Sequence, residues 1–390
     1  MNIRERKRMK IVHTADWHIG KILYGQQRYQ EYIDILEEFK EHLFQREVDV
    51  LLIAGDVYDY QNPSPDSKKL LYDFLYDISK RNIQTVIIAG NHDSENYFEA
   101  LKNIMQLANV TIRGFVHPDI TPTTLILEKN GQIVHFFLLP FISEKYFLQT
   151  QNFEKEDTHQ QLYSKGVGKI LNRIVEGKNP DHIYIVVSHI LIHGAKVSGS
   201  EKRLYLGSNY AVHPSQVPDG IDYFALGHMH YQQKIEESLV PIYYAGSILQ
   251  IDFAERETQK GYLFLDTEQD RPFVPEFVPL SKSKKLVSLK GTWQEIQQQT
   301  ETLDKENTYF ALDIQEQMNI PISQIQKELP NTLKIQQQPQ VIPDVEIHHQ
   351  AADWLPDMYR KYYQAQEKQQ VLPQVLQEFQ QLYTSCVRKK

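Results

Sequence analysis

Residues 51–59 read LLIAGDVYD, a run of apolar residues that ends abruptly at glycine and aspartate. Such a run, bounded by turn residues, is typical of a buried strand. Residues 86–93 repeat the pattern as VIIAGNHD, and residues 11–18 give a third version, IVHTADWH. Apolar residues at helical spacing fill the stretches between them, at 29–46 and 67–80. This alternation of strands and helices predicts an α/β fold.

More strands are expected later in the chain, where β-rich pairing replaces the early alternation. The full set of expected strands is 10–14, 48–54, 85–89, 134–139, 183–188, 223–226, 242–245 and 262–265. Residues 286–340 are predicted to form a small α+β unit, and residues 351–385 two helices. In the second helix an apolar stripe follows helical spacing; it comprises Leu372, Val375, Leu376, Phe379, Leu382 and Tyr383.

Composition divides the chain near residue 280. Of the 17 glycines only Gly291 lies beyond that point, and 21 of the 39 glutamines lie in the last 110 residues. Glycine serves tight turns and close backbone approaches, so the first 280 residues are where a site is expected. The predicted division is a catalytic domain over 9–280, a small domain over 281–345 and C-terminal helices over 346–390.

The overall composition excludes several classes of protein. Hydrophobic residues make up 41% of the 390-residue chain and charged residues 24%, as in soluble globular proteins. The formal net charge of −8 excludes a generally basic surface, and the single cysteine, Cys386, excludes a disulfide framework. The N-terminal MNIRERKR leads into no apolar signal region, so a cytoplasmic protein starting at Met1 or Met9 is expected.

Metal-competent side chains follow five of the expected strands. In α/β sheets, sites form where strands end, because strands hold the loop residues rigidly. The candidate metal ligands are Asp16, His18, Asp56, Asn91, His189, His228 and His230. This mixed oxygen and nitrogen set favours Mn²⁺, with Fe²⁺, Zn²⁺ and Mg²⁺ as alternatives. Seven ligands exceed the need of one ion, so two ions about 3.5–4 Å apart are expected.

The series D-x-H, G-D-x-x-D, G-N-H-D, H and G-H-x-H resembles the calcineurin-like metallophosphoesterase superfamily over roughly residues 9–246. The resemblance implies two packed mixed β-sheets flanked by helices, a four-layer sandwich, followed by a small capping domain and C-terminal helices. It also implies which ligands hold which ion. One ion is held by Asp16, His18, Asp56 and His230, and the other by Asp56, Asn91, His189 and His228, with Asp56 bridging.

The same resemblance assigns two further residues to catalysis. His92 matches the family's catalytic histidine, which stabilises or protonates the departing oxygen. Asp93 is expected to orient His92 or its loop. Some family members carry histidine at the position of Asp59, and an ionised acid does not donate a proton in the same way, so the role of Asp59 is left open.

A narrower resemblance is to the nuclease subunits of bacterial ATP-dependent DNA repair complexes, and it rests also on GSEKR near residue 200 and YAGSILQIDFAE near residue 250. It implies a DNA phosphodiesterase, an exonuclease on double-stranded ends and an endonuclease on single strands and hairpins. The implied partners are DNA and an ATPase with coiled-coil arms, which receives the C-terminal apolar stripe. Two nuclease subunits in a heterotetramer are also implied, with no membrane contact.

Two rival functions remain open at this stage. A stand-alone phosphoesterase for a small nucleotide or phosphodiester shares every metal ligand, although the 110-residue C-terminal extension argues against it. A non-catalytic scaffold is disfavoured because no ligand is missing.

Several residues near the motifs have simpler interpretations than a functional one. His182 and His193 compete with His189 for the ligand position, and His13 is expected in the core. Trp17 and Tyr58 are expected to pack rather than to stack on bases. The remaining candidates are expected at the surface; they are Lys196, Lys202, Arg203, His348 and His349.

Overall fold

The computed structural model describes residues 8–116, 123–143, 159–201, 211–316, 320–337, 375–379 and 381–382. The chain divides into a large compact unit, residues 1–336, and a second unit, residues 337–390. In the second unit, apart from Gln337, the described residues are 375–379 and 381–382, and they are helical. The other positions of the expected C-terminal helices, Leu372 and Tyr383 among them, lie outside the described residues.

Two six-stranded mixed sheets form the centre of the large unit. The first has the order β16 (Glu276–Pro279), β15 (Gly261–Asp266), β1 (Lys10–Thr14), β4 (Val50–Ala54), β5 (Gln84–Ile88) and β6 (Val110–Arg113). Its last four strands are parallel, and β15 and β16 are antiparallel to their neighbours.

The second sheet has the order β13 (Gln233–Lys234), β14 (Ile242–Tyr244), β12 (Tyr223–Gly227), β9 (Ile183–His189), β8 (Gln132–Leu139) and β7 (Thr123–Lys129). Strands β8, β9, β12 and β14 are parallel, whereas β7 and β13 pair with the edges in the antiparallel sense.

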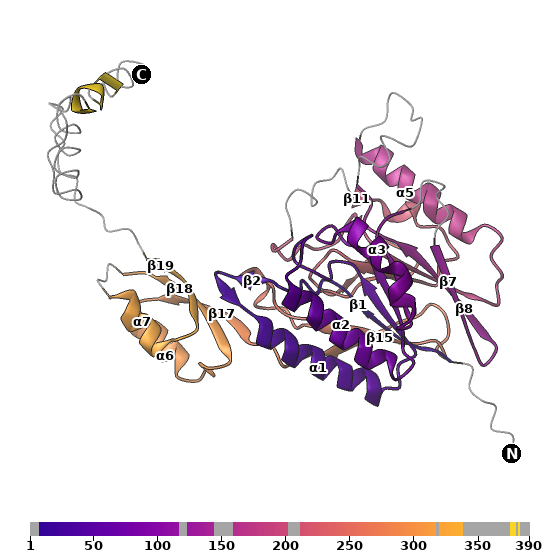
Figure 1. Ribbon diagram of the computed structural model, residues 1–390, viewed down its shortest axis with the longest axis horizontal. Coiled ribbons are helices and arrows are strands. Elements are labelled where there is room, and N and C mark those ends of the chain that lie inside the picture. The colour runs from indigo at the N-terminus through magenta and orange to yellow at the C-terminus, as the bar shows by residue number, and fades with distance from the viewer. Residues whose placement is uncertain are drawn as a thin grey trace. The chain divides into compact units, whose positions relative to one another are not determined.

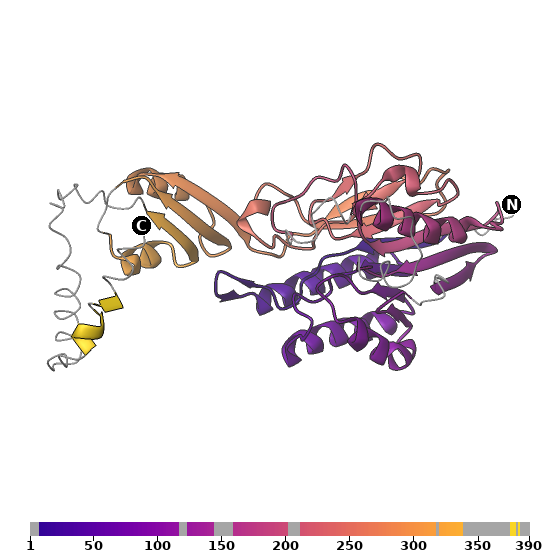
Figure 2. The same ribbon diagram turned by 90° about the horizontal axis from the view of Figure 1, so that it is seen from above.

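Helices cover the outer face of each sheet, which gives four layers (Figures 1 and 2). Helices α1 (Tyr29–Gln45), α2 (Pro65–Ser79) and α3 (Glu95–Gln106) lie on the first sheet, and α5 (His159–Val175) lies on the second. Between the sheets, apolar residues of β1, β4 and β5 pack on those of β8, β9 and β12. The expected four-layer sandwich of two mixed sheets is therefore confirmed.

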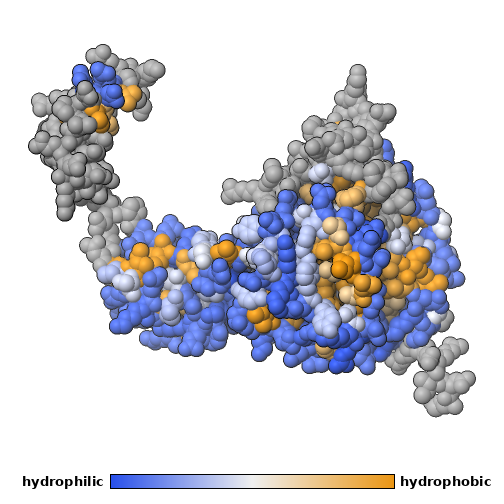
Figure 3. All heavy atoms as spheres, viewed as in Figure 1, coloured by the Kyte–Doolittle hydropathy of each residue, from blue (hydrophilic) through white to orange (hydrophobic). Residues whose placement is uncertain are grey.

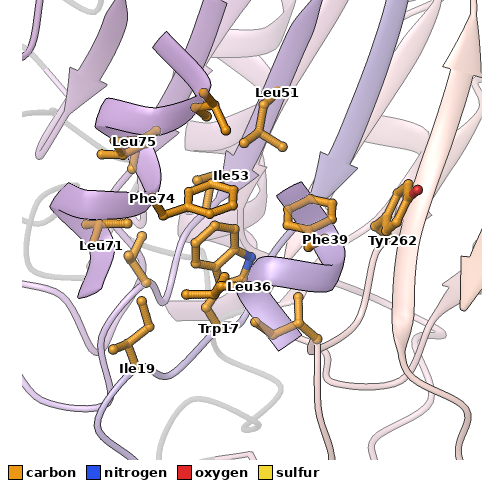
Figure 4. Close-up of a cluster of buried hydrophobic side chains, with 14 of the residues drawn as sticks. Trp17, Ile19, Leu36, Phe39, Leu51, Ile53, Leu71, Phe74, Leu75 and Tyr262 are labelled. Atoms are coloured by element: carbon orange, nitrogen blue, oxygen red, sulfur yellow. The ribbon is translucent and has the colours of Figure 1, made fainter. Parts of the chain in front are cut away.

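Apolar side chains between the first sheet and its covering helices explain the positions of α1 and α2. Trp17, from the loop after β1, packs edge-on against Phe39 of α1 and Phe74 of α2, with ring centroids 6.0 and 5.3 Å away (Figure 4). Helix α2 begins at Pro65 because the Ser64 side chain accepts a hydrogen bond from the Ser67 amide. The two helices thereby hold the loops that follow β1 and β4.

Residues 285–337 form a small α+β layer, as the sequence predicted, and all of it except Gln337 belongs to the large unit. Its sheet contains β17 (Lys285–Gly291), β18 (Thr308–Ile314) and β19 (Thr332–Gln337), with α6 (Trp293–Thr300) and α7 (Ile322–Glu328). A small apolar cluster joins this layer to the larger body, with Leu286 and Tyr309 on one side and Leu23 and Phe253 on the other. The domain boundaries themselves stay a prediction.

Short elements complete the described structure. They are β2 (Ile22–Leu23) paired with β3 (Gln26–Gln27), β10 (Leu191–Ile192) paired with β11 (Ala211–Val212), and the 3-10 helices η3 (Pro214–Gln216) and η4 (Phe253–Glu255). The face in Figure 3 is mainly hydrophilic, and apolar side chains gather over α3 and β7, where Ile104 and Ile126 are exposed. Among the described residues, no helix is long and apolar enough to cross a membrane.

Candidate metal centre

The five candidate segments meet at one edge of the two sheets. The loops after β1, β4 and β5 supply ligands from the first sheet, and β9 and β12 supply them from the second. Because these strands are parallel within each sheet, their carboxyl ends lie together. All seven predicted ligands are buried, with at most 7% of any of them exposed.

One cluster of donor atoms involves Asp16, His18 and His230, whose ligand atoms lie within 4.8 Å of one another. The Nε2 atoms of His18 and His230 are 3.2 Å apart. The Asp56 Oδ2 atom lies 3.6 Å from His18 Nε2. These are the four residues that the sequence assigned to one ion.

A second cluster contains Asp56 itself. The ligand atoms of Asp16, Asp56 and His189 again lie within 4.8 Å of one another. The Asn91 Oδ1 atom is 3.1 Å from His189 Nε2 and 2.9 Å from His228 Nδ1. The Asp56 carboxylate is thus adjacent to both groups, as a bridging ligand must be.

The backbone at these positions is strained. Asp16, His18, Asp56 and His228 have φ angles of 52°, 47°, 50° and 96°, in the left-handed region that side chains rarely adopt. Such conformations persist only where the surroundings enforce them, and they concentrate at functional sites. Here backbone amides fix the carboxylates, since His228 N donates to Asp16 at 3.0 Å and His92 N to Asp56 at 2.8 Å.

Glycines before two of the ligands make this crowding feasible. A Cβ atom on Gly90 would lie 2.1 Å from Asp56 Oδ1, and one on Gly55 would lie 2.3 Å from His189 Nδ1. Both distances are far below van der Waals contact. Hence the glycines of the AGD and AGNH motifs are needed where the loops of β4 and β5 approach each other and β9.

Burial and mutual charge shift the pKa values of these groups. Burial raises the pKa of Asp16 to about 6 and lowers that of His18 to about 4. Burial also opposes ionisation of Asp56, but His189 and neighbouring histidines hold its pKa well below the usual range. Although burial alone would lower it, the pKa of His189 is raised to about 9 by Asp56 and Asp16.

This electrostatic pattern fits a divalent metal. Buried carboxylates require compensating charge, and around Asp56 that charge comes from protonated histidine. A divalent cation supplies the same charge while leaving the imidazole nitrogens free to coordinate it. Carboxylate, amide oxygen and imidazole together form the donor set of Mn²⁺, Fe²⁺ or Zn²⁺.

The outward-facing ring nitrogens of three histidines each lie close to an oxygen atom. His189 Nδ1 lies 2.8 Å from the Ala54 carbonyl oxygen. His18 Nδ1 lies 3.2 Å from Asp59, and His230 Nδ1 lies 3.0 Å from Glu255. Partners of this kind fix the orientation of a metal-binding imidazole and raise its basicity.

Asp59 and Glu255 are thus residues whose roles the sequence did not reveal. The Asp59 carboxylate lies 3.2 Å from His18 Nδ1 and pairs with Lys21 at 3.3 Å, so it supplies negative charge beside His18. Glu255 is fully buried and pairs with Lys260 at 2.7 Å. The only sequence signal for Glu255 was its place in the YAGSILQIDFAE stretch.

A loop near residue 200 completes the surroundings of His230. The Ser200 hydroxyl contacts both His230 Nδ1 and Glu255, and the Glu201 carboxylate accepts a hydrogen bond from the His230 amide at 3.2 Å. Lys260 donates to the His230 carbonyl at 2.8 Å. Ser200 and Glu201 of the GSEKR stretch therefore support His230.

His92 lies beside the cluster, half-buried. Its Nδ1 atom is 2.8 Å from the Asp59 carbonyl oxygen, and its Nε2 atom is 4.0 Å from Asp56. Asp93 is buried and accepts hydrogen bonds from the amides of Val57, Tyr58 and Gly90 at 2.9–3.2 Å. The Asp93 carboxylate thus ties the β4 and β5 loops together, in line with the predicted role of holding the His92 loop.

The other residues considered in the sequence analysis do not belong to the two clusters of donor atoms. His13, Trp17 and Tyr58 are buried in the core, as expected, so base stacking by Trp17 or Tyr58 is excluded. His182 contacts His135 at 2.9 Å, and His193 stacks on His213. Lys196 is exposed. The candidates Lys202, Arg203, His348 and His349 lie outside the described residues.

Comparison with known proteins points to one family. The model of the calcineurin-like phosphoesterases matches residues 9–232. A relative from Staphylococcus epidermidis, SbcD of the nuclease SbcCD, is 32% identical over 332 residues, which cover 84% of this chain and 85% of the relative.

Solved structures with a similar arrangement were also found. The GAP50 anchor of the inner membrane complex of Plasmodium is 16% identical, with a TM-score of 0.44, over 86% of this chain and 98% of that one. A dimetal phosphatase from Danio rerio is 12% identical, with a TM-score of 0.40, over 70% of this chain and 99% of that one.

The buried ion pair of Glu255 and Lys260, next to His230, gives a first prediction. Glu255→Gln is expected to lower the free energy of unfolding by about 3–5 kcal/mol, because it leaves the Lys260 ammonium buried without a counter-charge. Adding Lys260→Met should recover part of that loss, which urea unfolding of the four variants of a double-mutant cycle will measure.

The exposed pair of Lys234 and Glu236 is the matched control, with 43% and 79% of the two side chains exposed. Removing either partner there should change stability far less, because water already screens both charges. Equal losses in the two pairs would contradict the role given to Glu255.

Proposed function

The chain belongs to the calcineurin-like phosphoesterase family and is a metal-dependent hydrolase, and on this premise we propose that it hydrolyses phosphodiester bonds of DNA with two divalent ions. The observation that carries the proposal is the convergence of seven buried oxygen and imidazole donors from five strand ends around Asp56. Two adjacent cation positions favour an anionic phosphate ester as substrate.

In the proposal, Asp16, His18, Asp56 and His230 hold one ion. Asp56, Asn91, His189 and His228 hold the other. Such a pair of ions supplies charge to neutralise the phosphate and lowers the pKa of bound water. Mn²⁺ is the ion that we propose, because the set combines hard oxygen donors with imidazole and includes no thiolate.

His92 acts on the departing oxygen in this proposal. It projects at the margin of the cluster, where its Nδ1 hydrogen bond to the Asp59 carbonyl leaves Nε2 facing the Asp56 side. Because Nδ1–H is donated to the carbonyl, Nε2 is the nitrogen from which the protonated ring gives a proton to the leaving group. Asp93 serves as a positioning residue, since its three backbone hydrogen bonds hold the loop that carries His92.

We assign DNA as the substrate on the relationship to the SbcCD nuclease. The finer proposal is an exonuclease on double-stranded ends and an endonuclease on single strands and hairpins, in the cytoplasm. The partner is an SbcC-type coiled-coil ATPase, and two nuclease subunits share one ATP-dependent heterotetramer. Activity of the purified chain with Mn²⁺ on hairpin and duplex DNA, with and without the ATPase and ATP, tests this directly; turnover of only a small nucleotide would favour the stand-alone phosphoesterase.

The bridging role of Asp56 predicts a loss of metal at both positions. Asp56→Asn removes the one carboxylate that both ions share, so elemental analysis should find well below two equivalents of Mn²⁺ per chain. Asp77→Asn, at a surface carboxylate paired with Lys40 and Lys80, should keep the wild-type content. Two full equivalents in Asp56→Asn would refute the bridge.

If His92 transfers a proton and is not a metal ligand, replacing it should slow cleavage without loss of metal. His92→Gln should retain Mn²⁺ and bind DNA, but cleave phosphodiesters about 10²–10⁴-fold more slowly, because a general acid contributes that factor. Metal content, DNA affinity and single-turnover cleavage are measured on the same preparation. Cleavage within a few-fold of wild type would remove His92 from the mechanism.

If the C-terminal helix docks on the ATPase, charges on its apolar stripe should prevent assembly of the complex. Leu376 and Phe379 are half-buried in the described helical residues, whereas Gln377 and Gln381 are exposed. Leu376→Glu with Phe379→Glu should abolish co-purification with the ATPase, because carboxylates in an apolar interface cost several kcal/mol. Cleavage of single-stranded DNA should survive.

Gln377→Glu with Gln381→Glu adds the same charge on the exposed face and should leave assembly intact. Co-purification of the Leu376 and Phe379 variant at the wild-type yield would contradict docking through this helix. An unfolded variant would instead place the helix in the core of the protein itself.

A further inference from the structure

A pocket of about 440 Å³ is lined in part by residues 19–22, which directly follow the proposed ligand His18 in the chain. Its walls are the loop after β1, from Ile19 to Ile22, the start of α1, and the loop from Tyr60 that leads into α2. The two helices lie side by side (Figure 1). The volume is within the range of small-molecule sites, about 300–1,000 Å³.

The pocket is joined to the proposed ligands through its own wall. Ile19 directly follows His18, and the Ile19 carbonyl accepts a hydrogen bond from the Asp59 amide at 3.2 Å. Lys21 of the pocket pairs with Asp59, which lies beside His18. The Tyr32 hydroxyl, also in the wall, donates to the His18 carbonyl. The pocket therefore shares the loop after β1 with the proposed ligand His18.

The charges in the pocket do not favour a second phosphate. Lys21 is paired with Asp59, and the buried Arg28 guanidinium is paired with Glu31 at 2.8 Å and donates to the Gln250 carbonyl. Asp66 adds an exposed carboxylate to the rim. With both cations neutralised, the pocket suits an uncharged group.

The exposed side chains match one such group, a nucleobase. Tyr29 and Tyr60 are 40% and 57% exposed, so their rings are available for stacking. Gln27 and Asn62 are exposed as well and offer amide donors and acceptors to the edge of a base. Aromatic faces beside amide groups are how proteins hold unstacked bases.

We propose that this pocket receives an unpaired base of the strand whose phosphodiester lies at the metal centre. The inference rests on the proposed nuclease function and names its substrate more closely. A paired base remains stacked in the duplex and does not reach the pocket, so the pocket favours single strands, hairpin loops and frayed ends.

The test measures binding rather than cleavage. Full-length protein in EDTA is titrated with two single-stranded oligonucleotides of equal length, one with all bases present and one with a central run of abasic sites. Wild type should bind the base-bearing strand about tenfold more tightly or better, because stacking of one base contributes about 1–3 kcal/mol. Tyr29→Ala with Tyr60→Ala should reduce that preference to within twofold.

Two matched variants serve as controls. Tyr29→Phe with Tyr60→Phe keeps the rings and should keep the preference. Tyr76→Ala removes an exposed tyrosine of α2 that does not line the pocket and should also keep it. A wild type without preference, or an undiminished preference in the double alanine variant, would overturn the proposal. Failure of the nuclease function itself shows separately, as no DNA hydrolysis by wild type with Mn²⁺.

Discussion

The burial of two carboxylates at one edge of the paired sheets is the constraint on which the site depends. Asp16 and Asp56 are almost fully buried, and such charges require compensation. Histidines of the second sheet supply part of it, so the two sheets must pack with β9 and β12 against β4. The same requirement explains why four ligands sit on left-handed backbone, because only sharply turned loops aim short side chains back at one point.

The strands, and the polar side chains that gather at their ends, were predictable because their signals are local. Apolar runs that end in Asp56 or His189 mark buried strands, and the structure places β1 at Lys10–Thr14, as predicted. Helix α3 was missed although its apolar residues fall on one face, and in the structure Phe98 is its buried residue. Strand β7 was missed because it is an edge strand that alternates exposed and half-buried residues.

The supports of the ligands were harder to find because they depend on tertiary structure. Glu255 is 25 residues from His230, and Asp59 is 41 residues from His18, so no spacing rule connects either pair. Each acid occurs in a quoted motif, but the motif alone does not show which histidine the acid contacts. A charged residue acquires its role only when the fold buries it beside a histidine, as with Glu255 between His230 and Lys260.

The 3-10 helix η4 contributes, within three residues, both to the packing of the small layer and to the contact with His230. Phe253, at its start, packs against Leu286 and Tyr309 of the small layer, and Glu255, at its end, holds His230. Because the helix is one short turn, Phe253 does not shift without moving the Glu255 backbone. The packing of residues 285–337 on the larger body therefore helps to fix the orientation of a proposed metal ligand, which gives that layer a structural role in this chain.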